Sequence, residues 1–97
     1  MVNIKELCRE AHRISESHGF WDGDKCLASK LMLITSELGE CLESDRCGNF
    51  DGVKEELADC FIRLADLCQH LEIDIEEEIR KKMEFNKSRP MKHGKRY

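Results

Sequence analysis

A chain of 97 residues with 40% apolar and 37% charged side chains is long enough for one small domain. The periodic apolar positions exclude a disordered chain, no apolar run is long enough to cross a bilayer, and the start, MVNIKELCRE, lacks the core of a signal peptide. The net charge of −4 hides an asymmetry, because residues 1–79 carry 19 acidic and 8 basic side chains, whereas residues 80–97 carry 1 acidic and 8 basic.

The first predicted helix starts after Asn3, a favourable N-cap, and Glu6 three residues later completes a capping box. We expect it to end near His18-Gly19, where the loop HGFWDGD begins. Its apolar face is formed by Ile4, Leu7, Cys8, Ala11 and Ile14.

The second predicted helix takes Asp24 as its cap and runs to about Arg46. Gly39 lies inside it at a cost of up to about 1 kcal/mol relative to alanine, so we expect another backbone or a ligand to approach closely there. Its apolar stripe consists of Leu27, Leu31, Ile34, Leu38, Cys41 and Leu42.

The third predicted helix follows the turn RCGNFDG and runs from about Val53 to Leu71. The fourth begins at Asp74, with Glu77 completing a second capping box, and residues 87–97 form a short basic tail. Residues 1–97 therefore predict a single all-α domain, a small four-helix bundle. The side chains expected to point inward from the third helix are Val53, Leu57, Cys60, Phe61, Leu64, Cys68 and Leu71.

The six cysteines include four on these apolar stripes, where a reduced thiol behaves as a small hydrophobic side chain. There is no C-x-x-C pair. Buried thiols in a cytoplasmic protein are therefore favoured over disulfides or a zinc site. The four are Cys8, Cys41, Cys60 and Cys68.

Two acidic pairs flank the turn between the second and third helices. Glu37 and Glu40, and then Glu56 and Asp59, are each three residues apart, so each pair forms one patch beside the apolar stripe of its helix. A short connection makes neighbouring helices antiparallel, which brings Glu40 level with Glu56 and Glu37 level with Asp59.

Four close carboxylates repel one another, and a cation relieves that repulsion. Oxygen ligands with open positions suit Mg²⁺ or Mn²⁺, which retain waters and bind substrate phosphates. The alternative is a solvated acidic face, paired with Lys30, Lys54 or Arg63.

The sequence resembles the MazG-like, all-α nucleoside triphosphate pyrophosphohydrolases from about Leu31 to Tyr97. That family has the pattern E-E-x-x-E, a spacer, then E-x-x-D; this chain has S-E-L-G-E at 36–40 and E-L-A-D at 56–59. The run E-I-x-K-K-M-x-x-N-x-x-R-P-x-x-H-G-K near the end is similar to small single-domain members. Ser36 replaces the first Glu of the pattern, so any role of that Glu in positioning or deprotonating water passes to another group or is lost.

The resemblance implies that Glu37, Glu40, Glu56 and Asp59 bind Mg²⁺. It implies cleavage of an NTP or dNTP to the monophosphate and pyrophosphate, in a house-cleaning role. It also implies homodimers or tetramers whose paired helical hairpins enclose the site.

Further side chains are candidates for binding the substrate. Lys82 and Asn86, one turn apart, match a K-x-x-x-N feature of similar proteins and are candidates for phosphate, as is Lys30; the alternatives are an exposed helix end and an ordinary helix lysine. Phe20 and Trp21 are candidates to stack on a nucleobase, or else to pack over the end of the bundle.

A pyrophosphohydrolase is therefore the leading hypothesis, and a non-catalytic module that binds a nucleotide or a partner helix is the alternative. Nucleic-acid binding through the basic tail ranks low, because the tail has few aromatic residues and the body is acidic. Helices two and three are too apolar for one chain to cover, which predicts an oligomer.

Overall fold

The computed structural model describes residues 3–23 and 25–97 and is all-helical over those ranges. This confirms the all-α part of the prediction. No helix among the described residues combines the length and the apolar character needed to span a membrane. The elements are α1 (Ile4–Ser17), α2 (Leu27–Arg46), α3 (Phe50–His70), α4 (Ile75–Lys87) and a short 3₁₀ helix, η1 (Met91–Gly94).

Local hydrogen bonds explain where the helices begin. Asn3 Oδ1 accepts from the Glu6 backbone N–H at 2.8 Å, and Asp74 Oδ1 accepts from the Glu77 N–H at 3.2 Å, as predicted. The prediction for α3 was wrong by one turn, because Asn49 Oδ1 accepts from the Gly52 N–H at 3.0 Å and starts the helix at Phe50.

The sequence also predicted an N-cap for α2 and a close approach at a glycine inside it. The cap predicted at Asp24 lies outside the described residues. At Gly39, an added Cβ would meet no described atom within 4 Å other than the neighbouring backbone of its own helix, so the close approach expected there is not found within one chain.

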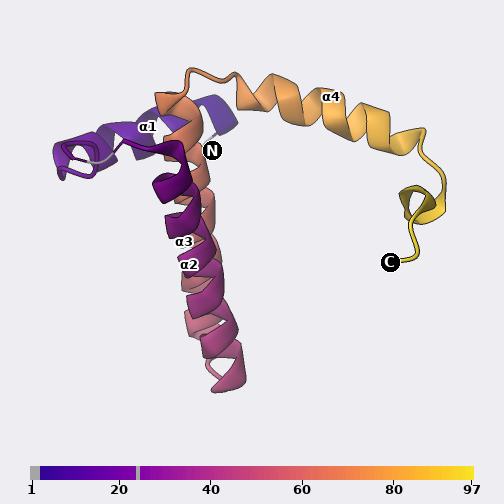
Figure 1. Cartoon of the computed structure of the whole chain (residues 1–97), viewed down its shortest axis with the longest axis horizontal. Helices are drawn as coiled ribbons and strands as arrows, with labels where there is room; N and C mark the ends of the chain where they lie inside the picture. The colour runs from indigo at the N-terminus through magenta and orange to yellow at the C-terminus, as the bar shows by residue number, and fades with distance from the viewer. Residues whose placement is uncertain (1–2, 24) are drawn as a thin grey trace.

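Helices α2 and α3 lie side by side as a hairpin, and α1 crosses the end of the hairpin where α2 starts and α3 ends (Figure 1). A three-residue turn joins α2 to α3. Gly48 in this turn has φ +72°, a conformation that glycine adopts without strain. The antiparallel neighbours expected from a short connection are therefore found.

The core is small and lies where α1 meets α3. Cys8 and Ala11 of α1 pack against Ala65 of α3, and Ile75 at the start of α4 contacts this cluster. Burial raises the pKa of the Cys8 and Cys60 thiols, as expected for cysteines acting as small hydrophobic residues. A second cluster joins Trp21, Ile34 and Leu67.

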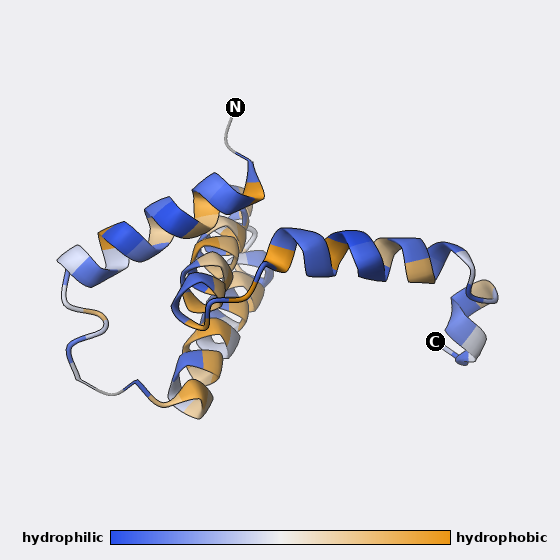
Figure 2. Cartoon of the chain, turned by 90° about the horizontal axis from the view of Figure 1, so that it is seen from above, coloured by the Kyte–Doolittle hydropathy of each residue, from blue (hydrophilic) through white to orange (hydrophobic). Residues whose placement is uncertain are grey.

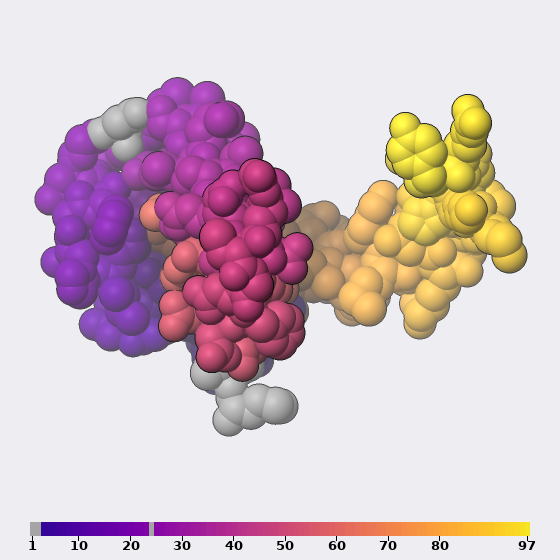
Figure 3. Space-filling model, turned by 90° about the horizontal axis from the view of Figure 1, so that it is seen from below, coloured from indigo at the N-terminus to yellow at the C-terminus, as the bar shows by residue number. Residues whose placement is uncertain are grey.

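Helix α4 projects away from the other three helices as an arm (Figures 1 and 2). The space-filling view shows the arm and the tail standing apart from the body (Figure 3). One chain therefore does not by itself form a four-helix bundle.

Much of the apolar surface of the hairpin is exposed, which corrects the expectation that these side chains point inward. Phe61, for example, is 67% exposed and Leu42 58%. By helical spacing, these residues lie along one face of α2 and one face of α3. The exposed members of the predicted stripes are Leu27, Leu31, Leu38, Leu42, Leu57, Phe61, Leu64 and Leu71.

Candidate metal centre

Three of the four predicted carboxylates converge between α2 and α3. Glu37 of α2 and Glu56 and Asp59 of α3 each offer an oxygen atom, and these three atoms lie within 4.8 Å of one another. The spacing of three on α3 places both of its acids on the side that faces α2. The sequence-predicted meeting of the two acidic patches is therefore found for these three residues.

Glu37 is the buried member of the cluster, with 8% of its surface exposed. Burial by itself would raise its pKa, but Arg63 Nε donates a hydrogen bond to Glu37 Oε1 at 2.9 Å, and the pKa is lowered as a result. Glu37 thus remains ionised at neutral pH, and the Arg63 guanidinium on the facing helix α3 holds it in place.

Glu56 has the opposite environment. The neighbouring Glu37 carboxylate, then burial, then Glu40 raise the pKa of Glu56 to about 7. Its Oε2 atom is buried and has no hydrogen-bond partner among the described residues. A buried oxygen without a partner is costly, and a bound cation would satisfy it.

Glu40 lies at the edge of this cluster. It is exposed and close enough to Glu56 to raise the pKa of that residue, but it is not one of the three converging oxygens. The predicted quartet is therefore a group of three with Glu40 beside it.

The donor set fits a hard divalent cation. Three carboxylate oxygens from two rigid helices, one of them buried and unsatisfied, provide the ligand chemistry that Mg²⁺ and Mn²⁺ use, with remaining positions for water or phosphate. Nothing in the set distinguishes these two ions.

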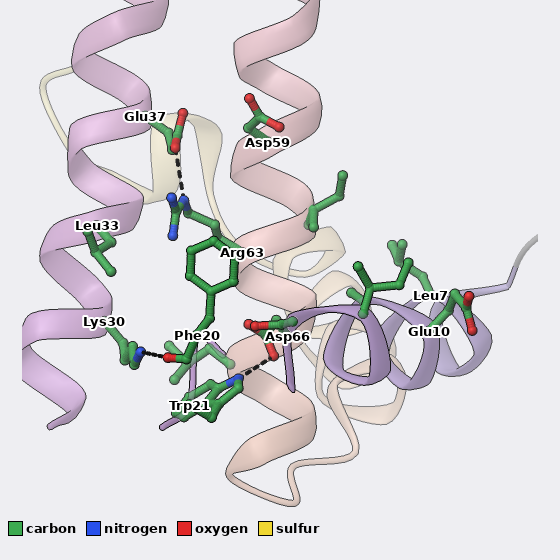
Figure 4. A pocket seen from close by; sticks show the side chains of 15 residues that line it. Leu7, Glu10, Phe20, Trp21, Lys30, Leu33, Glu37, Asp59, Arg63 and Asp66 are labelled. Atoms are coloured by element: carbon green, nitrogen blue, oxygen red, sulfur yellow. Dashed lines mark hydrogen bonds and ion pairs between the residues drawn. The ribbon is translucent and has the colours of Figure 1, made fainter. Parts of the chain in front are cut away.

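A cavity of about 550 Å³ lies next to the cluster, between α1, α2 and α3 (Figure 4). Glu37 and Asp59 lie at one end, and Phe20, Trp21 and Lys30 at the other, with Arg63 between them. Most of the wall is apolar, which suits a small organic ligand. The apolar wall includes Leu7, Ala11, Ile14, Leu33, Ile62 and Leu67.

The two aromatic residues proposed for a nucleobase differ in availability. Phe20 is 57% exposed and borders the cavity. Trp21 is buried at 6%, stacks on His70 with ring centroids 3.8 Å apart, and donates from Nε1 to Asp66 Oδ1 at 2.9 Å. Trp21 therefore packs over this end of the helices and already has a stacking partner.

The cations proposed for phosphate lie apart from the carboxylates. Lys30 donates to the Phe20 carbonyl at 2.7 Å and its Nζ lies 4.4 Å from the Trp21 ring centre, so it holds the loop before α2. Lys82 lies against Phe85 on α4, and the buried Oδ1 atom of Asn86 has no hydrogen-bond partner among the described residues. Lys82 and Asn86 belong to α4, which leads away from the α2–α3 hairpin (Figure 1), so a single chain does not bring them to the acidic cluster.

Sequence reasoning gave too little weight to two residues on the inner face of α3. Arg63 was expected only in the alternative interpretation, as an ion-pair partner of the acidic face, and its pairing with Glu37 is found. Asp66 was not considered at all. Asp66 Oδ1 accepts from Trp21 and lies 2.7 Å from His12 Nδ1, which joins the loop, α1 and α3. Their spacing of four and seven residues from Asp59 places both on the same helix face as the metal-binding candidates, and this is the signal that could have found them.

Comparison with protein-family models, with curated protein sequences and with solved structures gave no match to this chain.

Proposed function

We propose that this chain is a Mg²⁺- or Mn²⁺-dependent nucleotide pyrophosphohydrolase that cleaves an NTP or dNTP to the monophosphate and pyrophosphate. The observation that supports this most is the position of three converging carboxylates at the end of an apolar cavity large enough for a nucleoside. The converging carboxylates would bind a metal ion that holds the polyphosphate chain, and the apolar cavity would hold the base. The proposal includes a cytoplasmic, house-cleaning role, consistent with buried thiols such as Cys8 and Cys60.

In this proposal Glu37, Glu56 and Asp59 hold the cation, with Glu40 beside them. A bound divalent ion polarises phosphoryl oxygens and lowers the pKa of water. The cavity wall excludes water from the base and orients the nucleotide, with Phe20 at its rim. Charge that develops on the phosphate oxygens needs nearby cations.

We also propose that the chain works as a MazG-like assembly, a homodimer or tetramer formed through paired α2–α3 hairpins. The exposed apolar faces of α2 and α3 support this, since a second copy would cover them. Lys82 and Asn86 keep their proposed phosphate role only in an assembly, because α4 leaves the body of its own chain.

The test is a panel of NTPs and dNTPs, with Mg²⁺ and with a chelator, scored separately for pyrophosphate and inorganic phosphate. Pyrophosphate release that requires the metal is the expected result. Glu56→Gln is expected to reduce kcat at least about 100-fold, because it removes a ligand charge from the cluster. Glu43→Gln, on an exposed residue paired with Arg46, is the matched control and should retain full activity. A wild-type protein that turns over no member of the panel would rule out this function.

The second candidate is a non-catalytic module that binds nucleotides, and Ser36 is the observation that favours it. Its hydroxyl donates to the Leu33 carbonyl of its own helix at 2.7 Å, so it is already occupied at the position where the family pattern has Glu. Nucleotide binding of ordinary affinity without pyrophosphate release selects this function.

A further inference from the structure

Arg63 occupies the boundary between the acidic cluster and the apolar cavity. It lies on α3, four residues after Asp59, and therefore on the same helix face. Among the described residues its hydrogen-bond partner is Glu37, to which Arg63 Nε donates at 2.9 Å. Figure 4 shows its guanidinium directed toward Glu37, and both side chains line the cavity.

The contact with Glu37 leaves most of the guanidinium unused. An arginine has five N–H donors, and within residues 3–23 and 25–97 Arg63 uses only Nε in a hydrogen bond. The side chain is 32% exposed, and Arg63 is part of the cavity wall. Paired terminal nitrogens are the part of arginine that binds a phosphate in a two-pronged manner.

We propose that Arg63 exchanges Glu37 for a phosphate oxygen when a nucleotide binds, and that it holds the phosphate attached to the sugar. This inference rests on the proposed function. When the base lies in the cavity and the outer phosphates lie at the carboxylates, the phosphate attached to the sugar lies beside Arg63. Arg63 therefore contacts the monophosphate product as well as the triphosphate.

Electrostatics permits this exchange only when the acidic cluster has another counter-charge. Glu37 is nearly buried, and a buried carboxylate without a partner is strongly unfavourable. A cation held by Glu37, Glu56 and Asp59 would replace the charge that Arg63 gives up. Without it, Arg63 stays on Glu37, so phosphate binding by Arg63 is expected to depend on the divalent ion.

The test uses calorimetric titration of the wild type, Arg63→Gln and Arg63→Lys with dAMP, dCMP, dGMP and dTMP and with their nucleosides, in MgCl₂. Arg63→Gln should weaken binding of the best monophosphate about 10- to 100-fold, the range for losing a charge-assisted contact, and should leave nucleoside binding within about 2-fold. Arg63→Lys should give an intermediate loss for the monophosphate alone. Arg46→Gln is the matched control, since it breaks an exposed ion pair of the same 2.9 Å length.

A purely structural role for Arg63 gives a different pattern. Arg63→Gln would then weaken Mg²⁺ binding, measured by titration with the metal alone, and would weaken nucleoside and monophosphate binding equally. Either that equal loss, or wild-type affinity of both Arg63 variants for the monophosphate, overturns the inference, as does a wild type that binds no monophosphate. Thermal melting shows whether each variant is folded. If Arg63→Gln is unfolded, the affinities of Arg63→Lys for the monophosphate and the nucleoside are compared with those of the wild type instead. Pyrophosphate release is measured separately, so failure of the proposed function is distinguished from failure of this inference.

Discussion

The neighbouring carboxylates Glu37 and Glu56 have opposite pKa shifts, because one of them has the arginine and the other does not. Arg63 lowers the pKa of Glu37, whereas the resulting negative charge helps to raise the pKa of Glu56 to about 7. The cluster thus holds one carboxylate that ionises more readily than an ordinary glutamate and a second that releases its proton near pH 7.

The stability of the metal-free protein should fall as the pH rises from about 4.5 to about 7. The folded protein keeps the Glu56 proton over this window and the unfolded chain does not, so the stabilisation is complete below 4.5 and is lost as the pH passes 7. Glu37 acts in the opposite sense but below 4.5, where its lowered pKa costs stability as the pH falls.

Thermal melting in a chelator from pH 4 to 8 measures this effect as the difference between the wild type and Glu56→Gln, which has no proton to release. The melting temperature of the wild type should fall relative to that of the variant as the pH rises. Glu55→Gln, on the adjacent exposed residue, is the control. Parallel curves for the wild type and Glu56→Gln would contradict the predicted titration.

Asp66→Asn should lower the free energy of unfolding by about 1–3 kcal/mol, because the side chain is half-buried and bonds both His12 and Trp21. An amide keeps one acceptor but loses the charge that favours the His12 contact. Urea unfolding measures the change, with Asp45→Asn at an exposed position as the control. Equal losses in the two variants would show that the contacts of Asp66 contribute little.

The helix starts at Asn3 and Asp74 could be predicted from sequence because each depends on one side chain and a backbone N–H three residues later. Asn49 has the same arrangement, but Asp51 and Gly52 next to it also favour a turn, and the start of α3 was placed too late. The stacking of Trp21 on His70 joins residues far apart in the chain, and helical periodicity contains no information about it.

Asn49→Ala should therefore lower the free energy of unfolding by about 0.5–2 kcal/mol through loss of the cap of α3. Asn49→Asp keeps an acceptor oxygen at the same place and adds a favourable charge at the start of the helix, so it should retain the stability of the wild type. Chemical denaturation of the wild type, Asn49→Ala and Asn49→Asp measures the free energy of unfolding of each protein. An Asp variant as unstable as the Ala variant would show that the cap is not the cause.

At the scale of the whole molecule, the sequence predicted where the apolar stripes lie but not what covers them. A stripe marks the apolar face of a helix, and three helices of one chain leave the faces containing Leu42 and Phe61 exposed. The prediction that all four helices pack together failed because α4, whose start packs near α1, leads away from the hairpin.

Phe61→Glu should shift the protein toward smaller species in sedimentation velocity, because a charge cannot be buried in a contact between copies at this position. Helix content should stay the same, since the side chain is mostly exposed within its own chain. Met91→Glu, at an 89% exposed tail position, should leave the assembly unchanged. A wild type that sediments as a monomer at micromolar concentration would argue against the proposed assembly.

The chain has a single tryptophan, Trp21, and its indole lies in the wall of the cavity, against an imidazole and over a lysine. Its intrinsic fluorescence is therefore an optical probe already present in the native protein, with no label to attach. Any event that moves the loop before α2 away from α3 would separate the indole from the His70 ring and alter emission intensity and wavelength. Ligand entry and loop opening can thus be followed in real time by stopped-flow mixing.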